Sequence, residues 1–408
     1  MLGSGPNLNN VSAGGSETDA QTIFPAGTIS NLWCRVKTAA TANSTVILRK
    51  NGANGNETFS IGANTTGAFS DATNTDSTAS GDKIAVGITS GSTALVITII
   101  ATTFTSTNMS NTVTHMLSFQ DLSSQPSITG TYYSTPSGVT AYKTSSYNSA
   151  EANSKLRMRK AFTVNNFATF VTGGSGGTLN SRKNGANGNI TANLNVGSAQ
   201  LVQDTTHSDN LAVGDDFDWQ FSDTGTTYSY DFYSCDFTST NGDCIFACAT
   251  DDPVTSINTS VTAYYGLAGS LDTSQSTEAN AQVTVNNAFK FSELTCNVTS
   301  NSVTGNSTVK LRKNAGNAGP TLSIGANATG IFNDNTDTYT AATTDAMNYQ
   351  IVTGSTGTSI SISFIEVFGN ASPTAAATGP KYQHFDNTLR QNRQNYNPFG
   401  GDQMIIFG

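Results

Sequence analysis

The side chains that most often carry chemistry are few and scattered in this chain. The three histidines, His115, His207 and His384, lie far apart, and none stands in a recognisable motif with a serine, a cysteine or a carboxylate. General-base and nucleophilic catalysis need such partners within hydrogen-bond reach. The sequence therefore supports no catalytic triad, and we predict that the protein is not an enzyme.

The cysteines could in principle bind a metal or form disulfides. They are Cys34, Cys235, Cys244, Cys248 and Cys296. The spacing of the middle three does not match a zinc site, and no histidine lies near them in the sequence. An odd count argues against a disulfide framework, although one local disulfide stays open. We predict buried free thiols that pack as small apolar groups.

Carboxylates recur at fixed places and could suggest calcium or acid–base catalysis. The repeated aspartates are Asp71, Asp76 and Asp82, and again Asp334, Asp337 and Asp345; the repeated glutamates are Glu17, Glu151 and Glu278. Calcium needs about 6–8 oxygens from close ligands, and no Asp-x-Asp-x-Asp-Gly loop is present. A glycosidase needs two carboxylates across one sugar bond, whereas each glutamate is one position repeated. We predict aspartates in turns, and no metal or other cofactor.

These residues belong to a triplicated sequence. The octapeptide Arg-Lys-Asn-Gly-Ala-Asn-Gly-Asn at 49–56 recurs unchanged at 182–189 and in altered form at 312–317, a period of about 130 residues that marks an internal repeat. Cys34 and Cys296 occupy one position of the repeat, and Thr169 occupies it in the second copy. That exchange suits a small packed residue and not a metal ligand.

The repeated basic motif most simply marks a β-hairpin. Asn-Gly suits the two positive-φ positions of a type I′ turn, and an apolar run precedes it in the first copy. We expect the arginine and lysine to be exposed near the end of the entering strand. A binding role for the paired basic residues is the alternative.

Composition narrows the fold class. Charged residues make up 12% of the chain, the net charge is −9, and 38 of 408 residues are glycine. Short strands with frequent turn signals are typical of sandwiches and jelly rolls, and the run at 359–368 alternates with period two like a half-buried strand. We predict an all-β protein of three tandem jelly-roll-like β-sandwich domains and an extended C-terminal arm.

The predicted boundaries follow the repeat. They give an N-terminal arm over 1–11, sandwich repeats over 12–122, 140–250 and 270–370, linkers over 123–139 and 251–269, and a linker with a C-terminal docking arm over 371–408. An acidic chain argues against nucleic-acid binding, and no apolar run is long enough to cross a membrane. The N-terminus shows no basic region followed by an apolar run, so we expect no secretion signal.

The C-terminal arm differs from the three repeats and carries large apolar side chains between polar ones. The candidates for docking onto a partner are Tyr382, Phe385, Tyr396, Phe399, Ile405, Ile406 and Phe407. A frayed terminus without a binding role is the alternative. We favour docking, because a dispensable tail has little reason to keep so many large apolar groups.

Four strings in the first repeat resemble a domain type found in virion proteins of tailed phages. They are Gly-Thr-Ile-Ser-Asn-Leu at 27–32, Ile-Leu-Arg-Lys-Asn-Gly at 47–52, Phe-Ser-Asp-Ala-Thr-Asn-Thr at 69–75 and Ser-Gly-Asp-Lys-Ile at 80–84. In that domain type similar strings mark successive strands of a jelly-roll-like sandwich. The resemblance covers all three repeats but not the arm. The second copy departs before Asp204, and the third loses Asn-Gly and Gly-Asp.

The resemblance implies a non-enzymatic virion protein made in the host cytoplasm and carried on the outer surface of the particle. We expect a capsid decoration or cement protein whose three sandwiches form a pseudo-trimer, with the arm contacting other virion proteins such as the major capsid protein. The alternative is a tail fibre or receptor-binding adhesin that recognises host surface polysaccharide. In that case Trp33 and Trp219 are candidates for stacking on sugars, unless they pack in the core. A polysaccharide depolymerase is a third hypothesis, which would need an acidic pair in a groove.

Overall fold

The computed structural model is built almost entirely from β-strands. It describes residues 22–24, 26–79, 81–91, 95–106, 112–120, 130–140, 150–171, 177–194, 200–223, 230–249, 256–271, 274–285, 288–371, 381–385 and 406–407. Within these residues the helical elements are two short 3-10 turns, η2 (Glu151–Asn153) and η3 (Glu278–Asn280). The strands form three two-layered sandwiches, so the predicted all-β fold of three tandem jelly-roll-like sandwiches is confirmed.

Sandwich 3 shows the two layers most completely. One sheet has the order β22-β19-β30-β24-β27, with β20 and β28 beside it, and the other has the order β21-β29-β25-β26, with β23 beside it. The strands of the first sheet are β19 (Asp243–Ala249), β20 (Ser256–Asn258), β22 (Gly269–Ser270), β24 (Phe289–Asn301), β27 (Gly330–Asp334), β28 (Tyr339–Ala341) and β30 (Ser359–Ala371). Those of the second are β21 (Thr262–Tyr265), β23 (Val283–Thr284), β25 (Ser307–Lys313), β26 (Gly316–Ile324) and β29 (Ala346–Val352).

Sandwich 2 repeats this arrangement. One layer contains β8 (Thr112–Gln120), β10 (Gly138–Thr140), β12 (Phe162–Val171), β15 (Gln200–Asp204), β16 (Asp209–Leu211) and β18 (Tyr230–Ser239). The facing layer contains β9 (Gly130–Ser134), β11 (Leu156–Arg157), β13 (Gly177–Lys183), β14 (Ala186–Asn193) and β17 (Asp216–Asp223). Strand β8, which the sequence repeat places at the end of the first copy, pairs with β18 of sandwich 2. Likewise β19, at the end of the second copy, pairs with β30 of sandwich 3.

Sandwich 1 has one layer of β2 (Gly27–Thr38), β5 (Gly67–Thr78) and β7 (Val96–Ser106). The facing layer is β1 (Thr22–Phe24), β6 (Asp82–Thr89), β3 (Ser44–Lys50) and β4 (Ala53–Ile61) in that order. Strands β31 (Lys381–Phe385) and β32 (Ile406–Phe407) lie between β7 and β8. They therefore join the sheets of sandwiches 1 and 2 into one sheet.

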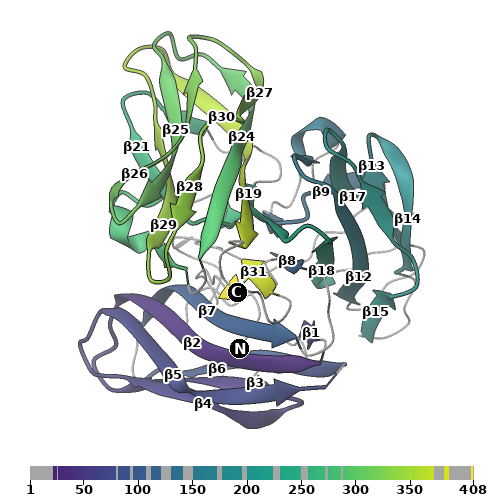
Figure 1. Ribbon diagram of the computed structural model, residues 1–408, viewed down its shortest axis with the longest axis vertical. Coiled ribbons are helices and arrows are strands. Elements are labelled where there is room, and N and C mark those ends of the chain that lie inside the picture. Colours follow the sequence, from purple (N-terminus) through teal and green to yellow (C-terminus); the bar gives the residue numbers. More distant parts are fainter. Residues whose placement is uncertain are drawn as a thin grey trace.

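The three sandwiches are arranged around a common centre, in which β31 lies (Figure 1). Sandwich 1 is the purple and blue lobe at the bottom, sandwich 2 the teal lobe on the right, and sandwich 3 the green lobe at the top. Each pair of lobes shares apolar contacts. Trp33 of sandwich 1 packs against the core of sandwich 3, and Leu201 of sandwich 2 packs against the core of sandwich 1.

Sandwiches 2 and 3 share the most extensive of the described apolar contacts. Phe364 and Phe368 of β30 belong to the same buried cluster as the core of sandwich 2, and the rings of Phe368 and Phe162 lie 6.0 Å apart. Burying one such side chain contributes about 1.5–3 kcal/mol. The prediction that 359–368 is half-buried is therefore wrong, because residues from Ile360 to Phe368 are buried on both faces of the strand. One face meets the core of its own sandwich, and the other meets the neighbouring lobe.

Candidate functional site

The repeated basic motif forms the hairpin that its sequence predicts. Asn51, Asn184 and Asn314 have φ values of 51°, 54° and 46°, and the next residues, Gly52, Gly185 and Ala315, have 84°, 80° and 63°. Two consecutive positive values are those of a type I′ turn, so the predicted turn is confirmed. In the third copy alanine takes the position at which the other two copies have glycine.

The arginine of the motif is held by the repeated glutamate. Arg312 Nε and Nη2 donate to the two carboxylate oxygens of Glu278 at 2.8 and 2.9 Å, and their side chains are 13% and 12% exposed. Arg182 makes the same bidentate contact with Glu151, at 3.2 Å for both bonds. Bidentate pairs are the strong form of this interaction. The expectation that these arginines stand exposed is wrong, because each one closes over a glutamate and the carbonyl of its own turn.

The lysine and asparagine of the motif hold a loop on the neighbouring strand. In the third copy Asn314 Nδ2 donates to Asp345 at 2.9 Å, Lys313 Nζ lies 3.3 Å from the same carboxylate, and the Ala346 N–H donates to Asn314 Oδ1 at 2.8 Å. Burial alone would raise the pKa of Asp345, but hydrogen bonds from the Ala342 N–H, Asn314 and Lys313 lower it. The equivalent residues make the same contacts in the other copies: Lys50, Asn51 and Asp82, and Lys183, Asn184 and Asp215.

Asp71, Asp204 and Asp334, which share one position of the repeat, are also hydrogen-bonded by the chain itself. Asp204 accepts the backbone N–H groups of Thr191, Thr206 and His207, each at 3.1 Å. Burial raises the pKa of Asp204, but these hydrogen bonds outweigh it and lower the pKa to about 2. Asp71 and Asp334 make equivalent contacts. Among the described residues no group of three or more His, Cys, Asp or Glu side chains could hold a metal ion.

The five cysteines are free and buried, as predicted. Cys34 and Cys296, with Thr169 at the same position of the second copy, have no exposed surface. Burial raises the pKa of the Cys34 and Cys296 thiols above the ordinary value, which leaves them poor nucleophiles and poor metal ligands. These positions serve packing.

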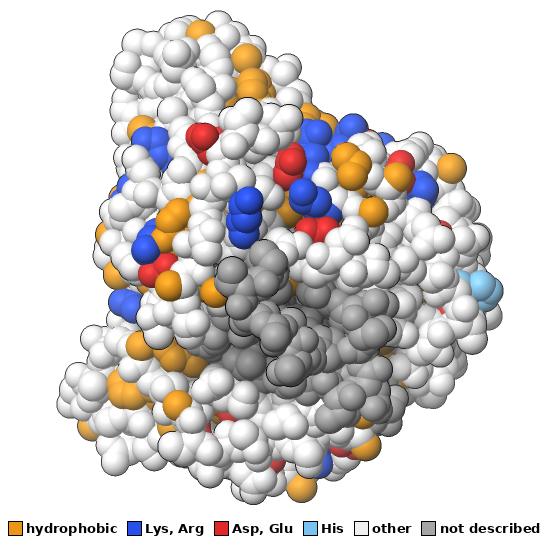
Figure 2. All heavy atoms as spheres, in the orientation of Figure 1, with side chains coloured by type: hydrophobic (Ala, Val, Ile, Leu, Met, Phe, Trp, Pro, Cys, Tyr) orange, Lys and Arg blue, Asp and Glu red, His pale blue; other side chains and the backbone are white. Residues whose placement is uncertain are grey.

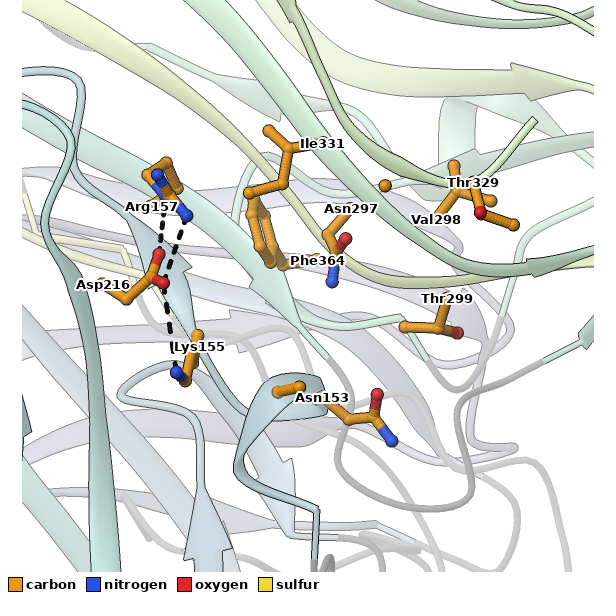
Figure 3. Close-up of a pocket in the computed structure, with 12 residues that line it drawn as sticks. Asn153, Lys155, Arg157, Asp216, Asn297, Val298, Thr299, Thr329, Ile331 and Phe364 are labelled. Carbon is orange, nitrogen blue, oxygen red and sulfur yellow. Dashed lines mark hydrogen bonds and ion pairs between the residues drawn. The ribbon is translucent and has the colours of Figure 1, made fainter. Parts of the chain in front are cut away.

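A cleft of about 410 Å³ lies where sandwiches 2 and 3 meet (Figure 3). One wall is polar: Arg157 Nη2 donates to Asp216 at 3.1 Å, and Lys155 Nζ lies 4.0 Å from the same carboxylate. The opposite wall carries Phe364 and Ile331, and Ile331 is 40% exposed. Figure 2 shows that charged side chains are sparse on the viewed face and gather mainly near the junction of the upper and right lobes.

The lining of this cleft offers a single carboxylate. Asp216 is the one carboxylate among its lining residues, and it is already paired with Arg157. Retaining and inverting glycosidases both need two carboxyl groups facing one bond. The lining therefore lacks the acidic pair that a polysaccharide depolymerase would require.

Both tryptophans make packing contacts, and Trp219 is not accessible for stacking on sugars. Trp219 is fully buried, and its ring lies 4.7 Å from that of Phe167 and 5.2 Å from that of Phe217. Trp33 is partly buried against sandwich 3. Core packing, the other interpretation of these residues, is confirmed for Trp219.

The docking candidates of the arm are partly described. Tyr382 and Phe385 lie in β31, and Ile406 and Phe407 form β32. These strands pair with β7 and β8 of the same chain. Tyr396, Phe399 and Ile405 lie outside the described residues. Docking of the arm onto a partner stays a prediction.

Sequence reasoning missed the glutamate–arginine pair and the contacts between lobes. The pair left a signal, since Glu151 and Glu278 recur at the same place relative to Arg182 and Arg312. The lobe contacts left none, because Phe364 and Phe368 look like ordinary residues of a core strand.

The fold defines the class: a chain of three tandem jelly-roll-like β-sandwiches whose repeated charged residues serve structure. No model of a known protein family matches the sequence, and no curated protein matches it. Among the solved structures that match is a chain from a structure described as "The Triple Jelly Roll Fold and Turret Assembly in an Archaeal Virus". It is 14% identical, the match covers 89% of this chain and 82% of that chain, and the TM-score is 0.18. The described part of the chain contains no helix that is long and apolar enough to span a membrane.

Proposed function

We propose that this chain is a non-enzymatic structural protein of a virus particle, and that it decorates or cements the outer surface of the capsid. The observation that carries the proposal is the arrangement of three homologous sandwiches around one centre within a single chain (Figure 1). Such a pseudo-trimer matches the symmetry of a three-fold position on a shell, where one molecule can contact three equivalent neighbours.

The use of the polar residues supports a structural role. The arginine and lysine of the repeated motif, in the copies where their partners are described, close hairpins and loops of their own sandwich. The described cleft lacks a pair of carboxylates, and the described cysteines are buried. A protein that binds its partner through complementary surfaces and sheet edges does not need free arginine, lysine, carboxylate or thiol groups for catalysis.

The partner in this proposal is another virion protein, for which the major capsid protein is our choice. The contact surfaces would be the rims of the sandwiches and the part of the C-terminal arm outside β31 and β32. The alternative of a tail fibre or adhesin predicts beads in a line that trimerise between chains. Packing of the lobes against one another, through Trp33, Leu201 and Phe368, favours the compact form.

Solution mass and shape test this proposal first. Light scattering coupled to small-angle X-ray scattering on the recombinant chain is expected to give a compact particle near 42.5 kDa. An elongated particle of about three times that mass, which the fibre alternative predicts because its chains would form a trimer, would overturn the capsid proposal and support the fibre.

Binding to particles tests the location. Capsids purified without the protein, from the virus that encodes it, are mixed with the chain and sedimented. We expect co-sedimentation that saturates at one chain per three-fold position. Binding to host cells or to tails, with none to capsids, would contradict the proposal.

A further inference from the structure

The strand order of sandwiches 2 and 3 defines eight positions. We number the eight main strands of sandwich 3 from 1 to 8 in chain order: β19, β21, β24, β25, β26, β27, β29 and β30. One sheet then has the order 1-8-3-6 (β19-β30-β24-β27), and the other has the order 2-7-4-5 (β21-β29-β25-β26). Sandwich 2 has the same order, with β8-β18-β12-β15 and β9-β17-β13-β14. This is the eight-strand, two-sheet pattern of a jelly roll.

Among the described residues between Thr22 and Ser106, sandwich 1 has strands at six of these positions. Its sheets are β7-β2-β5, which are positions 8-3-6, and β6-β3-β4, which are positions 7-4-5. Strand β1 does not supply position 2, since it pairs with the start of β6 as β11 and β23 pair with the starts of β17 and β29. Among the described residues no strand pairs with that edge of β6 over 85–89.

The start of strand β31 lies at the missing position 1, and β32 lies between its end and β7. It runs antiparallel to β7, with Lys381 opposite Thr105 and Tyr382 opposite Phe104. In sandwich 2, β8 runs antiparallel to β18, with Val113 opposite Thr238. Thr105 lies opposite Thr28, and Thr238 lies opposite Thr163. Because Thr28 and Thr163 occupy the same position of the repeat, Thr105 and Thr238 are equivalent.

The same rule of connection applies to all three sandwiches. Strand β8 follows the last strand of sandwich 1 and pairs into sandwich 2, and β19 follows the last strand of sandwich 2 and pairs into sandwich 3. Strand β31 follows the last strand of sandwich 3 and pairs into sandwich 1. Each sandwich is thus followed in the chain by a strand that pairs into the next sandwich, and the strand after sandwich 3 pairs into sandwich 1. We call these three strands, β8, β19 and β31, the donated strands.

The three donated strands meet at the centre of the molecule (Figure 1). Strand β31 pairs in parallel with β8, with His384 opposite His115. Strand β19 contacts both of the others, and the Ile245 N–H donates to Thr114 Oγ1 of β8 at 3.2 Å. The centre is therefore built from three equivalent strands, one from each connection.

We propose that Lys381–Phe385 is the first strand of sandwich 1, donated by the far end of the chain, and that the edge of β7 is a strand-acceptor site for this segment of the same molecule. An added strand binds through main-chain hydrogen bonds to an open sheet edge. Its donation closes the ring of three lobes and holds sandwich 1 against the other two. The assignment stands independently of the capsid role.

Cross-linking in the full chain tests the assignment. Thr105→Cys with Lys381→Cys places two thiols on opposite residues of β7 and β31. Val113→Cys with Thr238→Cys is the matched control at the equivalent position of sandwich 2, and Lys381→Cys alone is the negative control. The five native thiols are buried, so mild oxidation acts first on the introduced pair.

We expect both double variants to form one intramolecular cross-link, which mass spectrometry maps to the intended pair, at the mass of a single chain. Closure of the control pair without closure of 105–381 would overturn the assignment. Cross-linked dimers or larger ladders would also overturn it, because they would show that the strand is exchanged between chains.

Removal of β31 tests whether this strand holds sandwich 1 against the other two sandwiches. A chain that ends at residue 371 is expected to have a larger radius of gyration and faster proteolysis within sandwich 1 than the full chain. A synthetic 381–407 peptide should reverse both changes, and a scrambled peptide should reverse neither. Unchanged scattering and proteolysis after truncation would refute the closing role. Capsid binding by the cross-linked chain is read separately, so the two proposals can fail independently.

Discussion

Exchange of Thr344 for glycine should stabilise sandwich 3. Thr344 is the third residue of the turn 342–345, which is closed by the Asp345 N–H on the Ala342 carbonyl at 3.1 Å, and it has a φ of 81°. Gly214, at the same position of sandwich 2, has a φ of 93°. A positive φ at this position is the requirement of a type II turn, which selects glycine.

The magnitude follows from two opposing terms. A residue with a side chain in the left-handed region costs about 1–2 kcal/mol. Glycine loses about 0.5–1 kcal/mol more conformational entropy on folding. Thr344→Gly should therefore add about 1 kcal/mol. Gly214→Thr should remove a similar amount, and by strain alone, since a Cβ atom built there would meet nothing within 4 Å.

Scanning calorimetry measures both variants, with Thr344→Ala as the matched control. Alanine removes the threonine side chain but keeps a Cβ atom at positive φ, so we expect little change. We expect the transition of sandwich 3 to rise by about 2–4 °C for Thr344→Gly. The strain argument is refuted if the alanine variant gains as much as the glycine variant, or if Gly214→Thr is neutral.

Four further substitutions, one of them a control, test the packing and the electrostatics. Glu278→Gln keeps the shape but removes the charge opposite Arg312, and denaturant titration should show a loss of about 1–2 kcal/mol; an unchanged midpoint would contradict the pairing. Desolvation raises the pKa of Glu57 to about 8, against the lowering effect of the Leu32 N–H. The folded state thus favours the protonated acid, and stability should fall as the pH rises from about 4.5 to 8. Glu57→Gln keeps an acceptor for the Leu32 N–H and should make the stability depend less on pH in this range. An equal pH dependence in both proteins would show that Glu57 does not contribute to it. Phe368→Ala removes a ring shared by sandwiches 2 and 3 and should cost about 3–5 kcal/mol, whereas Ile331→Ala, at an exposed position, should cost little in the same thermal-unfolding assay.

Much of the fold could be predicted from local patterns. The triplicated Arg-Lys-Asn motif, the Asn-Gly turns and the low charge predict three β-rich units, because turn geometry and strand alternation depend on neighbouring residues only. The candidate site was less accessible. Arg182 and Arg312 were expected in solvent, since their partners lie 31 and 34 residues upstream and only the repeat connects them.

The sequence by itself determined the number of units, their all-β character, the type I′ hairpins and the packing role of the cysteine position. Tertiary structure alone decided which sheet receives β8 and β19, why 360–368 is buried on both faces, and where β31 pairs. The physical reason is that a strand carries the same main-chain donors and acceptors wherever it pairs. Its partner is selected by which open edge lies within reach once the three lobes have packed, and that edge is far away in the sequence.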